Sequence, residues 1–158
     1  MVSEVESDVV AASSMRFVII EPLDIQKIDA EGVDVMAKIV TYQDLVVWQK
    51  SMDLAKDIYR FAWSLPPEEK YALSDQMRRA VVSIPSNIAE GQARKTTKDF
   101  IHFLYIARGS NAELMTHLLL CQSFGYIDDK KLGSLKDGID EIGRLLSSLI
   151  RTLESKAE

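Results

Sequence analysis

The strongest constraint on how this chain folds is a stripe of apolar residues near its C-terminal end. Between residues 129 and 154 the apolar positions recur every three or four residues without a break, which places them on one face of an α-helix. This face consists of Leu132, Leu135, Ile139, Ile142, Leu146, Leu149 and Leu153. We predict a long amphipathic helix that buries this stripe against other helices.

Three earlier segments carry the same periodicity and predict helices over residues 42–64, 73–92 and 97–124. The connections between these segments are short, and short connections make consecutive helices antiparallel neighbours. No alternation of strands and helices competes with this pattern. We therefore predict an all-α fold, an antiparallel up-down-up-down four-helix bundle formed by residues 41–158.

Several residues indicate where the helices begin and end. Thr41 followed by Asp44, and Thr96 followed by Asp99, are typical of helix N-termini, because a threonine hydroxyl can accept a hydrogen bond from an unpaired backbone N–H group. Gly125 is expected to end the third helix.

Pro85 lies inside the second predicted helix. Its ring removes the hydrogen bond to the carbonyl of Val81, so we predict a kink there. The polar residues expected to bond the freed backbone groups are Ser83, Ser86 and Asn87. In the third helix Gly109 costs about 1 kcal/mol relative to alanine, so we expect a neighbouring helix to approach closely at this position.

The first and third predicted helices have more apolar surface than a single core face can use. In the first helix we assign the core face to Leu45, Trp48, Met52, Ala55, Tyr59 and Ala62. A second stripe then remains at Val47, Leu54, Ile58 and Phe61. In the third helix, residues 100–106 are apolar on almost every side. This surplus predicts self-association, and coverage by the N-terminal segment is the alternative.

The first 40 residues differ from the rest in charge. They hold eight acidic and three basic residues, so they carry the whole net charge of −5 and the other 118 residues are neutral. We predict a largely unstructured acidic leader over residues 1–40. Because Met36 shortly precedes the regular pattern, we infer that it is the native start and that residues 1–35 are an upstream extension.

The sequence carries no basic, apolar signal peptide and no apolar stretch long enough to span a membrane. Its one cysteine, Cys121, suits a reducing compartment. We expect a cytoplasmic protein that makes no membrane contact.

Residues 78–108 form a basic segment with six basic and two acidic residues. Several basic side chains on one face can bind phosphate groups, and assembly into an oligomer would multiply a weak patch. The candidate nucleic-acid-binding residues are Arg78, Arg79, Arg94, Lys95, Lys98 and Arg108. The alternative is a solvated face with surface ion pairs of little energetic value.

Glu113, His117 and Cys121 are spaced by four residues, so they share a helix face on which they could ligate a metal. A di-metal bundle site needs Glu-x-x-His motifs from two helices, and the sequence lacks such a pair. We predict no metal, no other cofactor and no catalytic residue. A small metal-dependent enzyme at this face is a distant alternative.

Three blocks of the chain resemble a known family. They are residues 42–50, residues 75–91 with the motif Ser-Ile-Pro-Ser-Asn-Ile-Ala-Glu-Gly, and residues 100–114. Together they resemble the four-helix-bundle proteins encoded in intervening sequences of bacterial 23S ribosomal RNA genes, and the related accessory variability protein of diversity-generating retroelements. The resemblance implies a homopentamer without catalytic activity. It also implies, from the retroelement relatives, a basic surface for nucleic acid and binding to a reverse transcriptase.

From these observations we predict a non-enzymatic, homo-oligomeric four-helix bundle that acts as a scaffold or accessory factor. The expected partners are further copies of the chain, and RNA or a nucleic-acid-associated protein. The alternative is a protein-binding adaptor that uses the acidic leader or the second apolar faces and contacts no nucleic acid.

Overall fold

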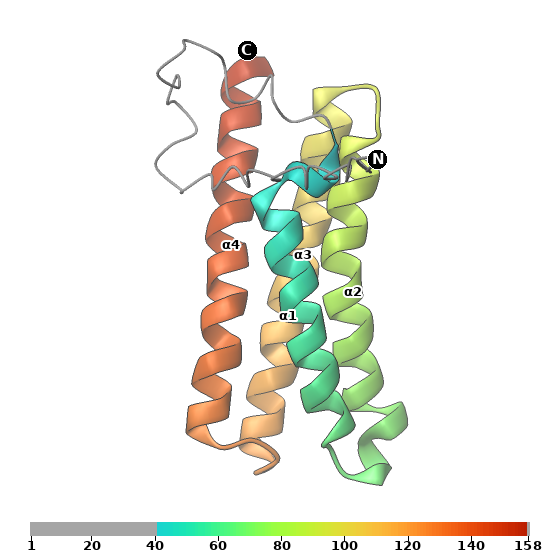
Figure 1. The fold of residues 1–158 in the computed structure, drawn as a ribbon, viewed down its shortest axis with the longest axis vertical. Coiled ribbons are helices and arrows are strands. Elements are labelled where there is room, and N and C mark those ends of the chain that lie inside the picture. The colour runs from blue at the N-terminus through green and yellow to red at the C-terminus, as the bar shows by residue number, and fades with distance from the viewer. Residues whose placement is uncertain (1–40, 158) are drawn as a thin grey trace, which may run out of the picture.

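The structure, a computed structural model, describes residues 41–157. Four α-helices and two short 3-10 helices make up this part of the chain (Figure 1). Their bounds are Tyr42–Asp44 (η2), Val46–Trp63 (α1), Pro67–Tyr71 (η3), Leu73–Gln92 (α2), Thr97–Ser123 (α3) and Asp129–Ala157 (α4). The predicted all-α bundle is confirmed, whereas the predictions for residues 1–40 lie outside the described residues.

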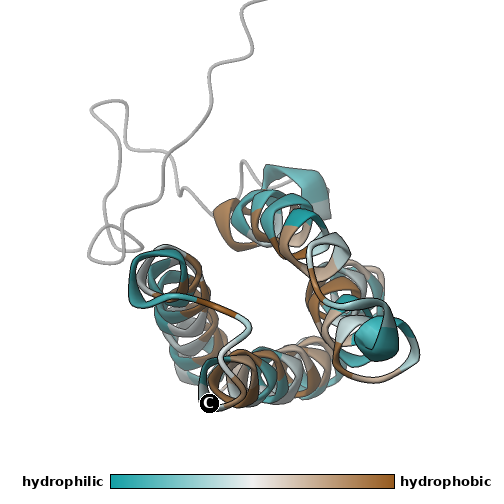
Figure 2. Cartoon of the chain, turned by 90° about the horizontal axis from the view of Figure 1, so that it is seen from below, coloured by the Kyte–Doolittle hydropathy of each residue, from teal (hydrophilic) through white to brown (hydrophobic). Residues whose placement is uncertain are grey.

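Consecutive helices run in opposite directions, and the four surround a common interior (Figures 1 and 2). α1 packs against α2 and α4, and α3 packs against the same two helices from the other side. Every residue of the predicted α4 stripe is buried in this interior. None of the helices within residues 41–157 is long and apolar enough to cross a membrane.

The core face of α1 differs in part from the predicted one, of which Leu45 and Ala62 are buried as expected. The buried side chains include Val47, Leu54, Ile58 and Phe61, the stripe that we had assigned to the second face. Trp48 and Tyr59 are only partly buried, and Met52 is exposed. The two stripes lie roughly 100° apart on the helix, and the positions of α2 and α4 decide which of them enters the core.

The predicted helix ends are confirmed with one difference. Thr41 and Asp44 form a capping box, but they cap the short helix η2, and α1 begins only at Val46. The hydroxyl of Thr96 accepts a hydrogen bond from the backbone N–H of Asp99 at 3.1 Å. Gly125 adopts a φ of +74° just after α3, which a residue with a Cβ atom adopts at a cost.

α2 and α3 form a close seam. A Cβ atom added at Gly91 would lie 2.6 Å from the Cβ of Phe103 and 2.9 Å from the Cδ2 of Phe100, so α3 passes directly over this glycine. Further along the seam, the hydroxyls of Ser83 and Ser110 share a hydrogen bond of 2.8 Å.

The expected close approach at Gly109 is wrong. This residue is exposed, and a Cβ atom added there would meet nothing within 4 Å. The close approach occurs instead at Gly91, near the C-terminal end of α2. α2 continues one residue beyond it, to Gln92.

Polar side chains support the backbone around Pro85, which lies buried inside α2. The hydroxyl of Ser86 donates to the carbonyl of Val82 at 2.8 Å. The amide of Asn87 donates to the carbonyl of Ser83 at 2.7 Å and to its hydroxyl at 2.9 Å. These carbonyls directly follow that of Val81, which the proline leaves without its helical donor.

Replacing Gly91 by alanine should lower the free energy of unfolding by about 1–3 kcal/mol, because the added methyl group overlaps α3. The matched control, Gly109→Ala, should raise it by about 1 kcal/mol, since alanine is the better helix former and has room. Urea denaturation followed by circular dichroism measures both changes. Equal effects of the two substitutions would contradict the close packing at Gly91.

Candidate nucleic-acid interface

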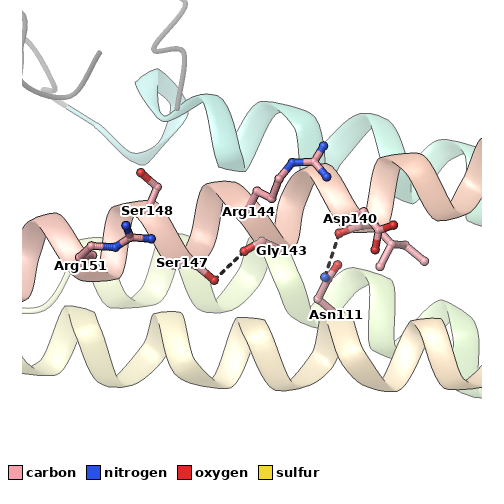
Figure 3. A pocket seen from close by; sticks show the side chains of 8 residues that line it. Asn111, Asp140, Gly143, Arg144, Ser147, Ser148 and Arg151 are labelled. Atoms are coloured by element: carbon pink, nitrogen blue, oxygen red, sulfur yellow. Dashed lines mark hydrogen bonds between the residues drawn. The ribbon is translucent and has the colours of Figure 1, made fainter. Parts of the chain in front are cut away.

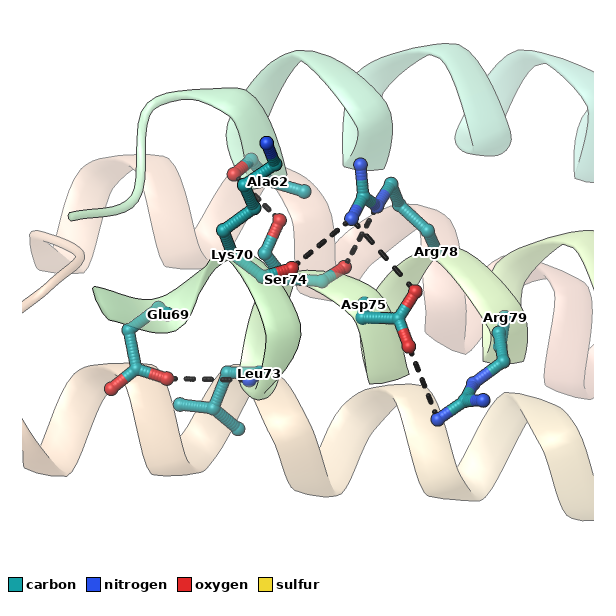
Figure 4. A network of polar contacts seen from close by, with 8 residues as sticks. All are labelled: Ala62, Glu69, Lys70, Leu73, Ser74, Asp75, Arg78 and Arg79. Atoms are coloured by element: carbon teal, nitrogen blue, oxygen red, sulfur yellow. Dashed lines mark hydrogen bonds and ion pairs between the residues drawn. The ribbon is translucent and has the colours of Figure 1, made fainter. Parts of the chain in front are cut away.

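Arg78 and Arg79 lie near the start of α2 and are held by local contacts (Figure 4). Arg78 donates from Nε to the carbonyl of Ser74 and from Nη2 to that of Lys70, both at 3.2 Å, and its side chain is only 24% exposed. Arg79 forms an ion pair of 3.2 Å with Asp75. Arg78 therefore fastens the turn before α2, and one carboxylate serves both arginines.

Arg94, Lys95 and Lys98 lie at the opposite end of α2, where the chain turns into α3. Arg94 is paired with Glu90, and its guanidinium carbon lies 4.9 Å from the centre of the Phe103 ring. Within residues 41–157, Lys95 and Lys98 form no ion pair, and both are exposed. These two lysines are the free positive charges of the corner.

Arg108 lies along α3, away from the corner. Its guanidinium carbon is 4.6 Å from the centre of the Tyr105 ring. The Tyr105 hydroxyl donates to Glu154 on α4 at 3.0 Å, and this hydrogen bond raises the pKa of Tyr105. Arg108 therefore lies against Tyr105 of its own helix, next to the contact of Tyr105 with α4.

The six basic residues do not form one surface. Arg78 and Arg94 are 16 residues apart, or about 24 Å along the helix axis. Arg108 is about 16 Å along α3 from its first residue, Thr97. Arg94, Lys95 and Lys98 lie within five consecutive residues at the turn from α2 to α3, and we define these three residues as the basic corner.

The metal-ligating alternative is not supported by the side-chain positions. His117 Nε2 lies 3.5 Å from Glu113 Oε1, but neither ring nitrogen of His117 has a hydrogen bond within residues 41–157. The thiol of Cys121 is buried and points to the sulfur of Met77 at 3.8 Å. Among the residues that the structure describes, no group of three His, Cys, Asp or Glu side chains could hold a metal ion.

A polar groove between α3 and α4 was not predicted (Figure 3). Its volume is about 540 Å³. The buried Asn111 of α3 lines it, and its amide donates to the carbonyl of Ile139 at 3.0 Å. The other polar lining residues, all on α4, are Asp140, Arg144, Ser147, Ser148 and Arg151. The available signal was the position of Asn111, four residues after Ala107 and three before Leu114, which places it on the buried face of α3.

A comparison with known protein families covers the basic corner and most of the α3–α4 groove. The model of the 23S rRNA-intervening sequence protein family matches residues 43–148. The chain belongs to this family. The match includes the basic corner and most of the groove, while Arg151 lies beyond it.

Among solved structures, this intervening-sequence protein is similar to a protein of unknown function from the S23 ribosomal protein family of Bacteroides thetaiotaomicron. The two are 33% identical with a TM-score of 0.63, and the match covers 67% of this chain and 96% of that one. No curated protein matches the chain. The relation to retroelement accessory proteins stays a prediction.

In the native intervening-sequence protein, Cys121 should resist alkylation by iodoacetamide. Burial, with a smaller effect of the Glu69 charge, raises the pKa of its thiol to about 11, and only the thiolate reacts. In the urea-unfolded chain, the pKa of about 8.5 allows rapid reaction. Mass spectrometry of both samples at equal times measures the difference, and rapid labelling of the folded protein would contradict the buried thiol.

The same difference in pKa predicts a pH dependence of stability. Because the folded protein holds the proton more tightly than the unfolded chain, the contribution of Cys121 is complete below about pH 8.5 and is lost as the pH rises towards about 11. The free energy of unfolding of the wild type should therefore fall over this range more than that of Cys121→Ala.

Proposed function

We propose that this intervening-sequence protein is a non-enzymatic, homo-oligomeric scaffold or accessory factor that contacts nucleic acid through its basic corner. The proposal has two parts, self-association and phosphate binding, and each rests on its own observation. It further assigns the protein to the cytoplasm, in keeping with the single reduced cysteine.

Exposed apolar side chains on α3 support self-association. Ile106, Leu120 and Phe124 lie on the side of α3 away from the core and are 40%, 39% and 58% exposed. Leu119, beside them on the helix, is 47% exposed. Leu119, Leu120 and Phe124 lie together in the last turns of α3, and an exposed apolar cluster of this kind marks an interaction surface. A second copy of the chain would cover it, and the family resemblance suggests five copies.

The basic corner supports phosphate binding. Lys95 and Lys98 are exposed and have no carboxylate partner among residues 41–157, so a phosphate group would not have to displace an existing ion pair. Two free lysines on one copy make a weak site. Repetition in an oligomer would place several such corners on one particle and raise the overall affinity for a long nucleic acid.

A protein-binding adaptor is the second candidate. Trp63 and Tyr71 are 70% and 84% exposed at the end of the bundle opposite the basic corner. Large exposed aromatic side chains are frequent energetic centres of protein interfaces. This function requires neither the basic corner nor nucleic acid.

Leu120→Glu should reduce the mass of the native assembly, because the new carboxylate would lose its hydration in an apolar contact between copies. Met52→Glu on α1 is the matched control, since Met52 is 38% exposed against 39% for Leu120. Native mass spectrometry measures the assembly, with circular dichroism as the test of folding. A monomeric wild type would contradict self-association.

Replacing both Lys95 and Lys98 by glutamine should weaken the binding of single-stranded RNA and make it less dependent on salt. Loss of two phosphate contacts lowers the slope of log K against log salt by about 1.4. The control Lys130→Gln/Lys131→Gln removes the same charge at the other end of the bundle. Fluorescence anisotropy at several salt concentrations measures the RNA binding of both variants. Unchanged RNA binding after the replacement of Lys95 and Lys98 would favour the protein-binding adaptor.

A further inference from the structure

The α3–α4 groove contains a buried acceptor that no group within residues 41–157 satisfies. Asn111 is only 6% exposed, and its amide nitrogen donates to the carbonyl of Ile139 at 3.0 Å, which fixes the orientation of the amide. The Oδ1 atom has no hydrogen-bond partner in the described part of the chain. Buried polar atoms of folded proteins are almost always hydrogen-bonded, so this carbonyl marks a place for a donor from a bound molecule.

Gly143 allows the amide to occupy this position. A Cβ atom on Gly143 would lie 3.3 Å from the Nδ2 atom of Asn111, closer than most such contacts. The absence of a side chain at residue 143 therefore keeps the floor of the groove open beside Asn111 (Figure 3).

The groove has acceptors at one end and donors at the other. Asp140 lies beside the contact between Asn111 and Ile139, and both of its oxygens accept hydrogen bonds. Arg144 and Arg151 follow at a spacing of seven residues, which puts them on one face of α4. From residue 140 to residue 151 the helix rises about 16 Å.

The two arginines are available for an anion. Both are exposed, and neither forms an ion pair in the part of the chain that the structure describes. Ser148 adds a hydroxyl between them, whereas the hydroxyl of Ser147 already donates to the carbonyl of Gly143 at 2.8 Å. Guanidinium groups bind phosphate in a bidentate manner and are well suited to it.

We propose that the α3–α4 groove binds a ribose phosphate, with the sugar hydroxyls on Asn111 and Asp140 and the phosphate on Arg144 and Arg151. Because Oδ1 is buried, the side chains that cover it must move when the sugar hydroxyl binds. The sugar phosphate belongs either to an RNA strand or to a free ribonucleotide. If the ligand is an RNA strand, the groove is a second part of the nucleic-acid contact proposed above, and this inference rests on that proposed function.

An acidic peptide fits the groove less well. Its carboxylates could pair with the arginines, but each backbone N–H group would need an acceptor. The carbonyls of α3 and α4 are already used within the helices, so the groove offers only Asn111 and Asp140. A ribose phosphate brings few donors and several acceptor oxygens, which matches this set.

The test compares a short single-stranded RNA with DNA of the same sequence, using the full-length protein and fluorescence anisotropy. The wild type should bind RNA about five- to tenfold more tightly than DNA, the effect of one further hydrogen bond. Asp140→Ala should remove this preference without weakening DNA binding. Arg144→Gln/Arg151→Gln should weaken RNA binding at least tenfold, whereas the control Lys130→Gln/Lys131→Gln keeps the preference.

Adenosine monophosphate, titrated by NMR against the wild type and the arginine variant, separates the two sources of the ligand. Saturable chemical-shift changes in the wild type that are absent in the arginine variant would support a free ribonucleotide as the ligand. RNA binding by a wild type that shows no such changes with the nucleotide would support an RNA strand.

The groove proposal is overturned if the wild type binds RNA and DNA equally and the arginine variant binds like the wild type. It is also overturned if a polyglutamate peptide displaces RNA from the wild type and binds the Asp140→Ala variant more tightly. RNA binding that depends only on Lys95 and Lys98 would leave the proposed function intact while excluding the groove. If the wild type binds neither RNA nor the nucleotide, the groove proposal and the proposed nucleic-acid contact are both excluded.

Discussion

The close packing of α2 on α3 is the contact on which the rest of the bundle depends. Gly91 lets the first turns of α3 lie against the end of α2, and the paired hydroxyls of Ser83 and Ser110 hold the middle of the seam. A short turn joins the two helices, so the position of one determines that of the other. Because the turn is fixed in this way, Arg94, Lys95 and Lys98 are presented together at its surface.

α3 is also held from its other side, and this determines what remains exposed. Tyr105 reaches Glu154 of α4, and Asn111 reaches the carbonyl of Ile139. With contacts to α2 and α4 on both flanks, the outer side of α3 has no neighbour within residues 41–157. Leu120 and Phe124 are exposed on that side, and the proposed self-association would bury them.

The sequence predicted the helices, their caps and the α4 stripe, because each depends on local spacing. It failed where the answer depends on neighbours. α1 carries two apolar stripes, and periodicity alone could not tell that Ile58 rather than Tyr59 enters the core. Glycine composition likewise could not distinguish Gly91, which α3 covers, from the open Gly109. Charge counting grouped Arg78 with the corner residues, although its contacts fasten a turn at the other end of α2.

Asn111 cannot be explained by stability alone. A buried amide with an unpaired carbonyl costs about 1–3 kcal/mol, and an apolar side chain in the same register would avoid this cost. The hydrogen bond to Ile139 satisfies the amide nitrogen of Asn111 but not its carbonyl oxygen. Gly143, which makes room for the Asn111 side chain, also lowers the helix propensity of α4. Such features accumulate where a protein binds something. Within residues 41–157 the neighbouring Arg144 and Arg151 form no ion pair, which supports the proposal of an anionic ligand.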